Sequence, residues 1–401
     1  MTTSDVPPLS LSAFDLSPDR GFLPAGDPLA QVAEEPILNQ IGTELPKLLS
    51  ARQVRGVIQD RQDIMGAVAD EWGLDVFRSV MRALSFVGHA YVWEDPDHPA
   101  TRLPACLARP WCQVAQQLGR PPVLSYASYA LHNWRRLDPH KPIELGNIVL
   151  LQNFLGGLDE EWFVLIHIDI EAKAGPGLQG LVQAHHAARV DRADAVLAGL
   201  GALAGAQEAM RETLLRMPER CDPYIYYSRV RPYIHGWKNS PALPNGVIYE
   251  GVPEYAEQPQ QFRGETGSQS SIVPALDAGL GVPHAEDPLT QYLVEMRDYM
   301  PPRHRAFLAA LEAQRDGQGR PLLFGYVRDR KSTHPELWRA YCACVDLLAQ
   351  FRQIHVDYAE RYIFRQHQSH AGNPTAVGTG GTPFMPYLTK HLEDTKRLIQ
   401  E

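Results

Sequence analysis

Residues 336–364 read ELWRAYCACVDLLAQFRQIHVDYAERYIF, and this stretch decides the fold. Apolar and aromatic side chains recur in it at spacings of three and four, which is the period of one face of an α-helix. These side chains are Leu337, Tyr341, Val345, Leu348, Phe351, Tyr358 and Tyr362. The pattern predicts a long helix with a buried stripe, and His355 falls on that stripe.

The pattern around His355 leaves two interpretations open. A histidine on an apolar helix face is by default a core residue that hydrogen bonds to a carbonyl. Imidazole is also the commonest metal ligand. As the proximal ligand of a heme, His355 would need an apolar slot, one neutral nitrogen aimed at iron and a partner for the other nitrogen. Arg352, one turn earlier, would then meet a propionate or a carboxylate at the rim.

The helical period continues through most of the chain. It is seen in Ile64, Val68 and Trp72, and again in Leu197 and Leu200. The 33 prolines and 31 glycines fall mainly between such segments, where they end helices and form turns. The sequence therefore predicts an all-α fold without internal repeats.

One domain boundary divides the predicted helices into two bodies. Gly156 and Gly157 precede an acidic start and the apolar run 162–168, which ends before Gly175-Pro176-Gly177, so we expect this segment to bridge two helical bodies. We predict a small N-terminal helical domain at residues 1–155, a connecting segment at 156–177 and a larger helical domain at 178–401. Residues 252–271 are predicted to be a long loop, and loops of that length are often functional.

Charge and composition exclude several classes of protein. There are 38 basic and 47 acidic residues, a formal charge of −9, and no Lys/Arg run that would follow a phosphate backbone, so nucleic acid is not an expected partner. Residues 1–10 lack the features of a signal peptide, and the small apolar run 195–206 is too short to cross a membrane. We expect a soluble cytoplasmic protein. Five cysteines without a CxxC pair predict reduced thiols.

Three further patterns can be interpreted without a catalytic or metal-binding role. His185-His186 and His367-x-x-His370 lack matched metal-ligand spacing, so we interpret them as surface histidines. The run GTGGT at 378–382 lacks the lysine and the preceding strand of a phosphate loop, and a flexible flap is the better interpretation. Arg231 lies among aromatic residues, where it forms either a structural ion pair or a clamp for a substrate carboxylate.

Five separated motifs together resemble the indoleamine 2,3-dioxygenase family. They are PPVLSYA (121–127) with NW (133–134), GWK (236–238) with YEG (249–251), FRGETGSQSS (262–271), MPPRH (300–304) and GTGGT (378–382). Each motif is weak alone, but five in the family's order over residues 121–382 make coincidence remote. The first hundred residues match in general character only.

The resemblance implies a heme enzyme, with heme b in the larger domain. His355 matches the family's proximal iron ligand. Arg352 and Asp277 match a charge pair that steadies the ligand helix on that side of the heme.

On the distal side the resemblance implies a pocket for the substrate. Tyr126, Phe163 and Tyr226 match its aromatic wall, and Arg231 matches the residue that binds the substrate carboxylate. Gly264, Thr266 and Thr379 match residues that close around the ammonium group and the heme edge.

Two pocket positions depart from the mammalian pattern. Tyr129 and His167 stand where those members carry a cysteine and a serine, which predicts a smaller and more polar cavity. A distal histidine that accepts the indole N–H is what the sister family, tryptophan 2,3-dioxygenase, uses. We therefore expect His167 to orient the indole.

The implied reaction is insertion of O₂ across the indole C2–C3 bond of L-tryptophan to give N-formylkynurenine, in tryptophan catabolism through the kynurenine pathway. We expect a monomer that binds neither nucleic acid nor a membrane. Three alternatives remain open: oxygenation of another, substituted indole; a heme or O₂ carrier without turnover; and a helical interaction protein that binds no heme.

Overall fold

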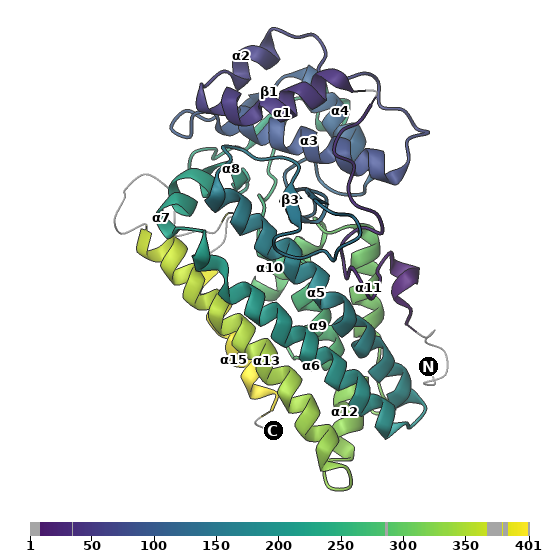
Figure 1. The fold of residues 1–401 in the computed structure, drawn as a ribbon. Coiled ribbons are helices and arrows are strands. Elements are labelled where there is room, and N and C mark those ends of the chain that lie inside the picture. The colour runs from purple at the N-terminus through teal and green to yellow at the C-terminus, as the bar shows by residue number, and fades with distance from the viewer. Residues whose placement is uncertain (1–8, 34, 285–287, 367–378, 380–383, 400–401) are drawn as a thin grey trace.

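The computed structural model describes residues 9–33, 35–284, 288–366, 379 and 384–399. Within these ranges the chain is mainly helical with a few short strands, so the predicted all-α class is confirmed. Helices α1–α4 form an upper body, and long helices run beneath it (Figure 1). The GTGGT motif, apart from Thr379, and the pair His367 and His370 lie outside the described residues.

The upper body contains four helices and all five strands. The helices are α1 (Pro36–Ser50), α2 (Val54–Gln59), α3 (Leu74–Trp93) and α4 (Ala105–Gln117). The strands are β1 (Arg102–Leu103), β2 (Trp134–Arg136), β3 (Ile148–Leu150), β4 (Val247–Tyr249) and β5 (Pro259–Gln260).

The lower body contains the long helices. They are α5 (Leu158–Arg189), α6 (Ala193–Leu215), α9 (Ile272–Leu280), α10 (Pro288–Arg297), α11 (Pro302–Glu312), α12 (Leu322–Asp329), α13 (Pro335–Ala359) and α15 (Phe384–Arg397). Short pieces α7 (Pro223–Ile225) and α8 (Arg231–Ile234) link the bodies. Single turns of 3₁₀ or π type lie at Leu11–Phe14, Ala127–Leu131, Met217–Glu219, Tyr226–Val230, Pro253–Tyr255, Gly267–Gln269 and Glu360–Phe364.

Two hydrophobic cores correspond to the two bodies, but neither is built from one continuous segment. Trp237 and Tyr249, from the second half of the sequence, pack into the upper core, and β4 pairs in parallel with β1 and antiparallel with β5. Leu9 and Phe22, from the N-terminal segment, pack into the lower core. The division at residues 155 and 177 therefore stays a prediction.

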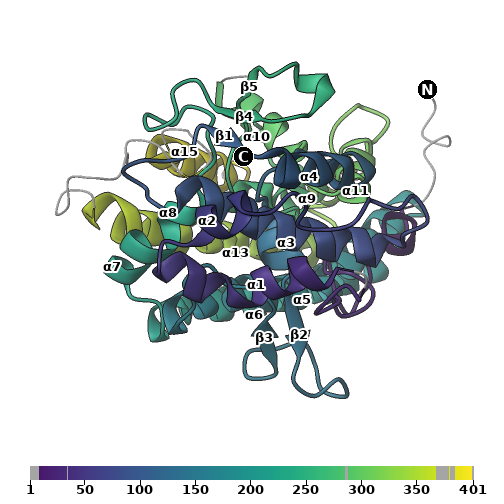
Figure 2. The ribbon, with the colours of Figure 1, turned by 90° about the horizontal axis from the view of Figure 1, so that it is seen from above.

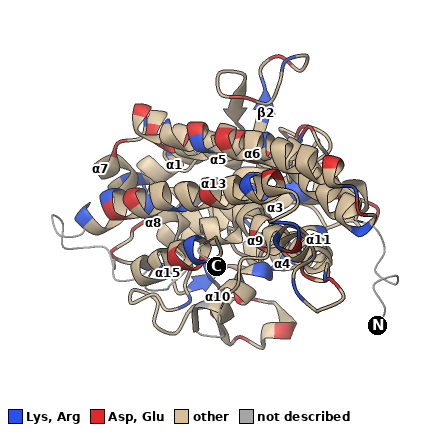
Figure 3. Ribbon diagram, turned by 90° about the horizontal axis from the view of Figure 1, so that it is seen from below, with Lys and Arg blue, Asp and Glu red and all other residues tan. Residues whose placement is uncertain are grey.

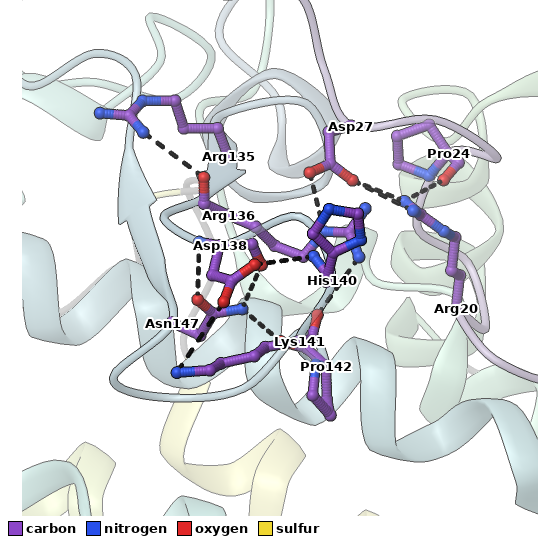
Figure 4. A network of polar contacts seen from close by, with 10 residues as sticks. All are labelled: Arg20, Pro24, Asp27, Arg135, Arg136, Asp138, His140, Lys141, Pro142 and Asn147. Carbon is purple, nitrogen blue, oxygen red and sulfur yellow. Dashed lines mark hydrogen bonds and ion pairs between the residues drawn. The ribbon is translucent and has the colours of Figure 1, made fainter.

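A polar network holds the N-terminal segment against the β2–β3 hairpin (Figure 4). Asp27 accepts hydrogen bonds from Arg20 at 3.1 Å and from Arg136 at 2.9 Å. Burial opposes the charge on Asp27, but the two arginines outweigh it and hold the pKa of this carboxyl below its usual value. The hairpin projects from the edge of the molecule in the view from above (Figure 2). These hydrogen bonds therefore fix the N-terminal segment, which contributes residues to both hydrophobic cores.

Most of the predicted connecting segment at 156–177 lies within one long helix. Helix α5 is continuous across Gly175, Pro176 and Gly177 and ends at Arg189. The glycines there allow close packing instead: a Cβ on Gly175 would lie 2.3 Å from the carbonyl oxygen of Pro18, and one on Gly177 would lie 2.7 Å from the Cβ of Ala206. Small residues thus mark where α5 meets its neighbours.

Several other expectations can be compared with the structure. The predicted helix at 336–364 is confirmed as α13 followed by one π turn. All five cysteines are free, as expected. His185 was expected at the surface, but it is buried, with Nε2 2.9 Å from the carbonyl oxygen of Gly279, so this prediction is wrong. A core histidine can satisfy its polar atoms on a backbone carbonyl.

The outer surface carries both signs of charge. Seen from below, basic and acidic residues are interspersed along α5, α6 and α13 (Figure 3). Among the described residues, no helix is long and apolar enough to cross a membrane.

Candidate functional site

One cavity lies between the start of α5, the end of α13 and the loop at 265–268. It holds about 1150 Å³ of atom-free space, part of it open to the surroundings. Its lining is mostly apolar and aromatic. The lining residues include Phe163, Leu214, Met217, Tyr226, Leu293, Tyr358, Tyr362, Ile363 and Leu388.

Helix α5 carries two of the predicted residues into this cavity. The carboxylate of Glu160 accepts hydrogen bonds from the backbone N–H groups of Phe154, Leu155 and Gly156 at 2.6–3.0 Å, which holds the chain where α5 begins. Acidic residues in a first helical turn also interact favourably with the helix dipole. Phe163 and His167 follow one turn apart and therefore share a face of the helix.

His167 is a neutral hydrogen-bond acceptor toward the cavity. Its Nδ1 lies 2.7 Å from the carbonyl oxygen of Phe163, and because a carbonyl can only accept, Nδ1 carries the ring proton. Burial lowers the pKa of His167, so the ring is uncharged near neutral pH. The remaining nitrogen, Nε2, offers a lone pair, and the ring of Phe163 lies 4.7 Å from the imidazole between centroids.

His355 lies in the same cavity. Its stripe predicted a packed environment, but the side chain is exposed, and the space that it faces is the cavity. Desolvation by the protein around the cavity, and then the nearby His167 and Arg352, lower the pKa of His355 to about 4. Among the described residues the imidazole has no hydrogen-bond partner. A neutral ring with free nitrogens meets the requirement for a metal ligand.

Behind His355, Arg352 and Asp277 form the ion pair that the resemblance implies. Their Nη2 and Oδ2 atoms are 2.6 Å apart, and His284 Nε2 lies 3.2 Å from the same oxygen. Arg352 also donates to the hydroxyl of Thr395 in α15. Burial opposes ionisation of Asp277, but Arg352 and His284 reverse the effect and lower the pKa of the carboxyl. The pair ties α13 to α9 and α15.

Six of the predicted site residues lie in the cavity wall and four lie behind it. The wall contains Phe163, His167, Tyr226, Thr266, Thr379 and His355. The lining does not include Tyr126, Tyr129, Arg231 or Gly264.

Each of the four residues behind the wall has a defined environment. Tyr126 donates to Glu171 at 2.8 Å, and Tyr129 packs behind Phe163 at 6.5 Å between centroids. Arg231 is fully buried, with its guanidinium 5.7 Å from the ring of Tyr227. A Cβ on Gly264 would lie 2.1 Å from the backbone nitrogen of Gly236, so only glycine fits there.

Glu265 lines the cavity and was not predicted from the sequence. It stands between Gly264 and Thr266 inside the motif FRGETGSQSS, and that placement was the available signal. Its backbone carbonyl accepts a 2.5 Å hydrogen bond from the hydroxyl of Thr379, so this one described residue of the predicted flap is held at the cavity.

The fold and the cavity define a class of protein: a mainly helical chain that can hold a flat, apolar prosthetic group. The lining fits a heme, because its aromatic and aliphatic walls match a porphyrin, and an imidazole such as that of His355 would supply the ligand that a porphyrin-bound iron requires. No cluster of three or more His, Cys, Asp or Glu occurs in the part of the chain that the structure describes.

Comparison with known proteins gives the family. The family model for indoleamine 2,3-dioxygenase matches residues 10–398, so the chain belongs to this family and is a heme-dependent dioxygenase. It is 33% identical to indoleamine 2,3-dioxygenase 2 of Homo sapiens, an alignment that covers 98% of this chain and 96% of that protein. It is 32% identical to indoleamine 2,3-dioxygenase of Saccharomyces cerevisiae over 96% and 92% of the two chains. A protein of Haliotis madaka named myoglobin is 28% identical over 98% and 99%.

Proposed function

We propose that this protein inserts O₂ across the C2–C3 bond of L-tryptophan to give N-formylkynurenine, with heme b bound through His355. The observation that carries the proposal is one apolar cavity lined by two neutral imidazoles, those of His355 and His167. Heme, when bound, supplies the chemistry that activates O₂. The sequence contains no C-x-x-C-H pattern for covalent attachment, which supports heme b rather than a c-type heme.

The residues of the chain bind and orient the indole. His167 Nε2 accepts the indole N–H, while the rings of Phe163 and Tyr226, 4.7 Å apart between centroids, pack against the indole plane. The hydroxyls of Thr266 and Thr379 stand at the cavity wall nearest Glu265. Holding a substrate in one orientation within a dry cavity removes much of the entropic barrier to reaction.

Arg231 is proposed to bind the substrate carboxylate from behind the wall, a role that requires its guanidinium to reach past Tyr226. Arg352 and Asp277 are proposed to hold the helix that carries His355. Every group in this scheme comes from one chain, and we therefore propose that the protein acts as a monomer in the cytoplasm.

Product analysis tests the reaction. The purified, heme-loaded and reduced protein is incubated with L-tryptophan and O₂, and N-formylkynurenine is measured by mass and absorbance. Substituted tryptophans run in parallel test the alternative that another indole is the substrate. A product other than N-formylkynurenine from L-tryptophan would contradict the proposed reaction.

One relative supports a second candidate function. Haliotis madaka myoglobin matches this chain along nearly its whole length, and its name is that of an oxygen-binding protein rather than of an oxygenase. A carrier of this kind would bind O₂ reversibly and consume no indole. Stoichiometric O₂ binding without loss of tryptophan would favour this candidate.

A further inference from the structure

Glu265 is a buried acid in the wall of the cavity. It is 4% exposed, and its backbone is held on both sides: its N–H donates to the carbonyl oxygen of Ile234 at 3.0 Å, and its own carbonyl accepts from Thr379. The position of the side chain is therefore set by the loop that closes this side of the cavity.

The carboxyl of Glu265 lacks a partner, unlike the two other buried glutamates nearby. Glu160 accepts from three backbone amides, and Glu171 accepts from Tyr126 and Ser270 at 2.8 and 2.9 Å. In the described part of the chain, the carboxyl of Glu265 makes no hydrogen bond and no ion pair. Burial alone raises its pKa to about 8. Because this carboxyl lines the cavity, a ligand bound there can supply the partner that a buried polar group requires.

Glu265 also sets the charge of the cavity. The described lining contains no other carboxyl, no lysine and no arginine, and the pKa values of its histidines at 167, 355 and 391 are all lowered, chiefly because the surrounding protein desolvates them. Burial disfavours the ionised form of Glu265, whereas a cation bound beside it favours that form. An ammonium group is therefore the charged group that this wall complements best.

We propose that Glu265 binds the ammonium group of the substrate and makes the cavity selective for indoles that carry an amine. This inference rests on the proposed function, because it takes an indole as the occupant of the cavity. With the indole N–H on His167 and the rings against Phe163 and Tyr226, the amine-bearing side chain is directed to the wall formed by Glu265, Thr266 and Thr379.

The test compares binding of three probes to the heme-loaded protein, followed by the change in heme absorbance. The probes are L-tryptophan, tryptamine, which lacks the carboxylate, and indole-3-propionate, which lacks the amine. Charge-assisted hydrogen bonds have strengths that correspond to about a tenfold change in Kd or more. Glu265→Gln should weaken tryptophan and tryptamine by at least that factor and leave indole-3-propionate unchanged.

A second variant and a measurement on the unaltered protein complete the design. Glu171→Gln removes a buried carboxyl that does not line the cavity, so it should not discriminate between probes with and without the amine. In the unaltered protein, L-tryptophan should bind at least about tenfold more tightly than indole-3-propionate, which carries the same carboxylate and lacks the amine. That comparison holds even if Glu265→Gln fails to fold.

The outcomes separate this inference from the reaction. Equal effects of Glu265→Gln on all three probes, or equal Kd values for L-tryptophan and indole-3-propionate in the unaltered protein, overturn the role of Glu265 even when N-formylkynurenine is formed. Amine-selective binding that depends on Glu265 but gives no oxygenated product supports the role and overturns the proposed reaction.

Discussion

Replacing His167 by alanine tests whether this histidine binds the indole N–H. The hydrogen bond from Nδ1 to the Phe163 carbonyl leaves Nε2 as an acceptor, and the lowered pKa keeps the ring neutral. Loss of one such acceptor removes roughly 0.5–1.5 kcal/mol, or about 3 kcal/mol if the N–H is left buried and unpaired. At about 1.4 kcal/mol per factor of ten, kcat/KM for tryptophan should fall about two- to twelvefold, with an upper end near 150-fold.

The assay uses an analogue with sulfur in place of the indole nitrogen, which has no N–H to donate. Steady-state rates on both substrates, normalised to heme content, should show a larger loss for tryptophan. His167→Gln keeps an acceptor and should recover part of the loss. Protonation turns Nε2 into a donor, and because the pKa is lowered, activity on tryptophan should fall only below about pH 6.5. Equal loss for both substrates would show that His167 shapes the cavity without contacting the N–H.

Four other substitutions test heme binding, carboxylate recognition and the packing of α5 on α6. His355→Ala should abolish stable heme binding, because iron loses its one strong protein ligand; heme retained at full stoichiometry with an unchanged ferrous spectrum rejects the assignment. Arg231→Leu should lower kcat/KM for tryptophan at least about tenfold with normal heme content and hardly affect tryptamine; equal losses would make the arginine structural. Gly180→Ala places a methyl 2.6 Å from the carbonyl oxygen of Gly199 and should cost about 1–3 kcal/mol in the free energy of unfolding, whereas Gly201→Ala meets no atom within 4 Å and should gain up to about 1 kcal/mol. Denaturant unfolding measures both, and equal effects would refute the close packing of α5 on α6.

The helices could be predicted because their periodicity is local information. Helix α13 follows its apolar stripe closely, since Leu337, Tyr341 and Val345 pack into the lower core as the spacing requires. The end of α5 could not be predicted in this way. Gly175 and Gly177 are helix-breaking by local propensity, and only the approach of Pro18 and Ala206 from elsewhere in the chain gives the small residues their purpose.

The motifs allowed residues near the site to be predicted, but they did not show which of these residues line the cavity. Tyr126 directly precedes the π turn Ala127–Leu131, and Tyr129 lies in its middle. Both are buried, yet neither lines the cavity: Tyr129 packs against Phe163, which does line it, and Tyr126 donates to Glu171, which does not. A motif places a residue near a site, whereas tertiary packing decides which side chain reaches the surface of the wall.

His355 shows where periodicity stops being informative. The spacing of the stripe predicts which face of α13 turns inward. It does not distinguish a face that packs against side chains from a face that contacts a ligand. Toward its N-terminal end the face meets the side chains of the lower core, whereas at His355 it meets the cavity, and the imidazole there is exposed and has no hydrogen-bond partner among the described residues. Glu265 was overlooked for the same reason: an acid in a polar loop looks solvated until the fold buries its carboxyl in an apolar wall. Residues that local rules place wrongly, and that the fold leaves without partners, are therefore the ones expected to bind a ligand.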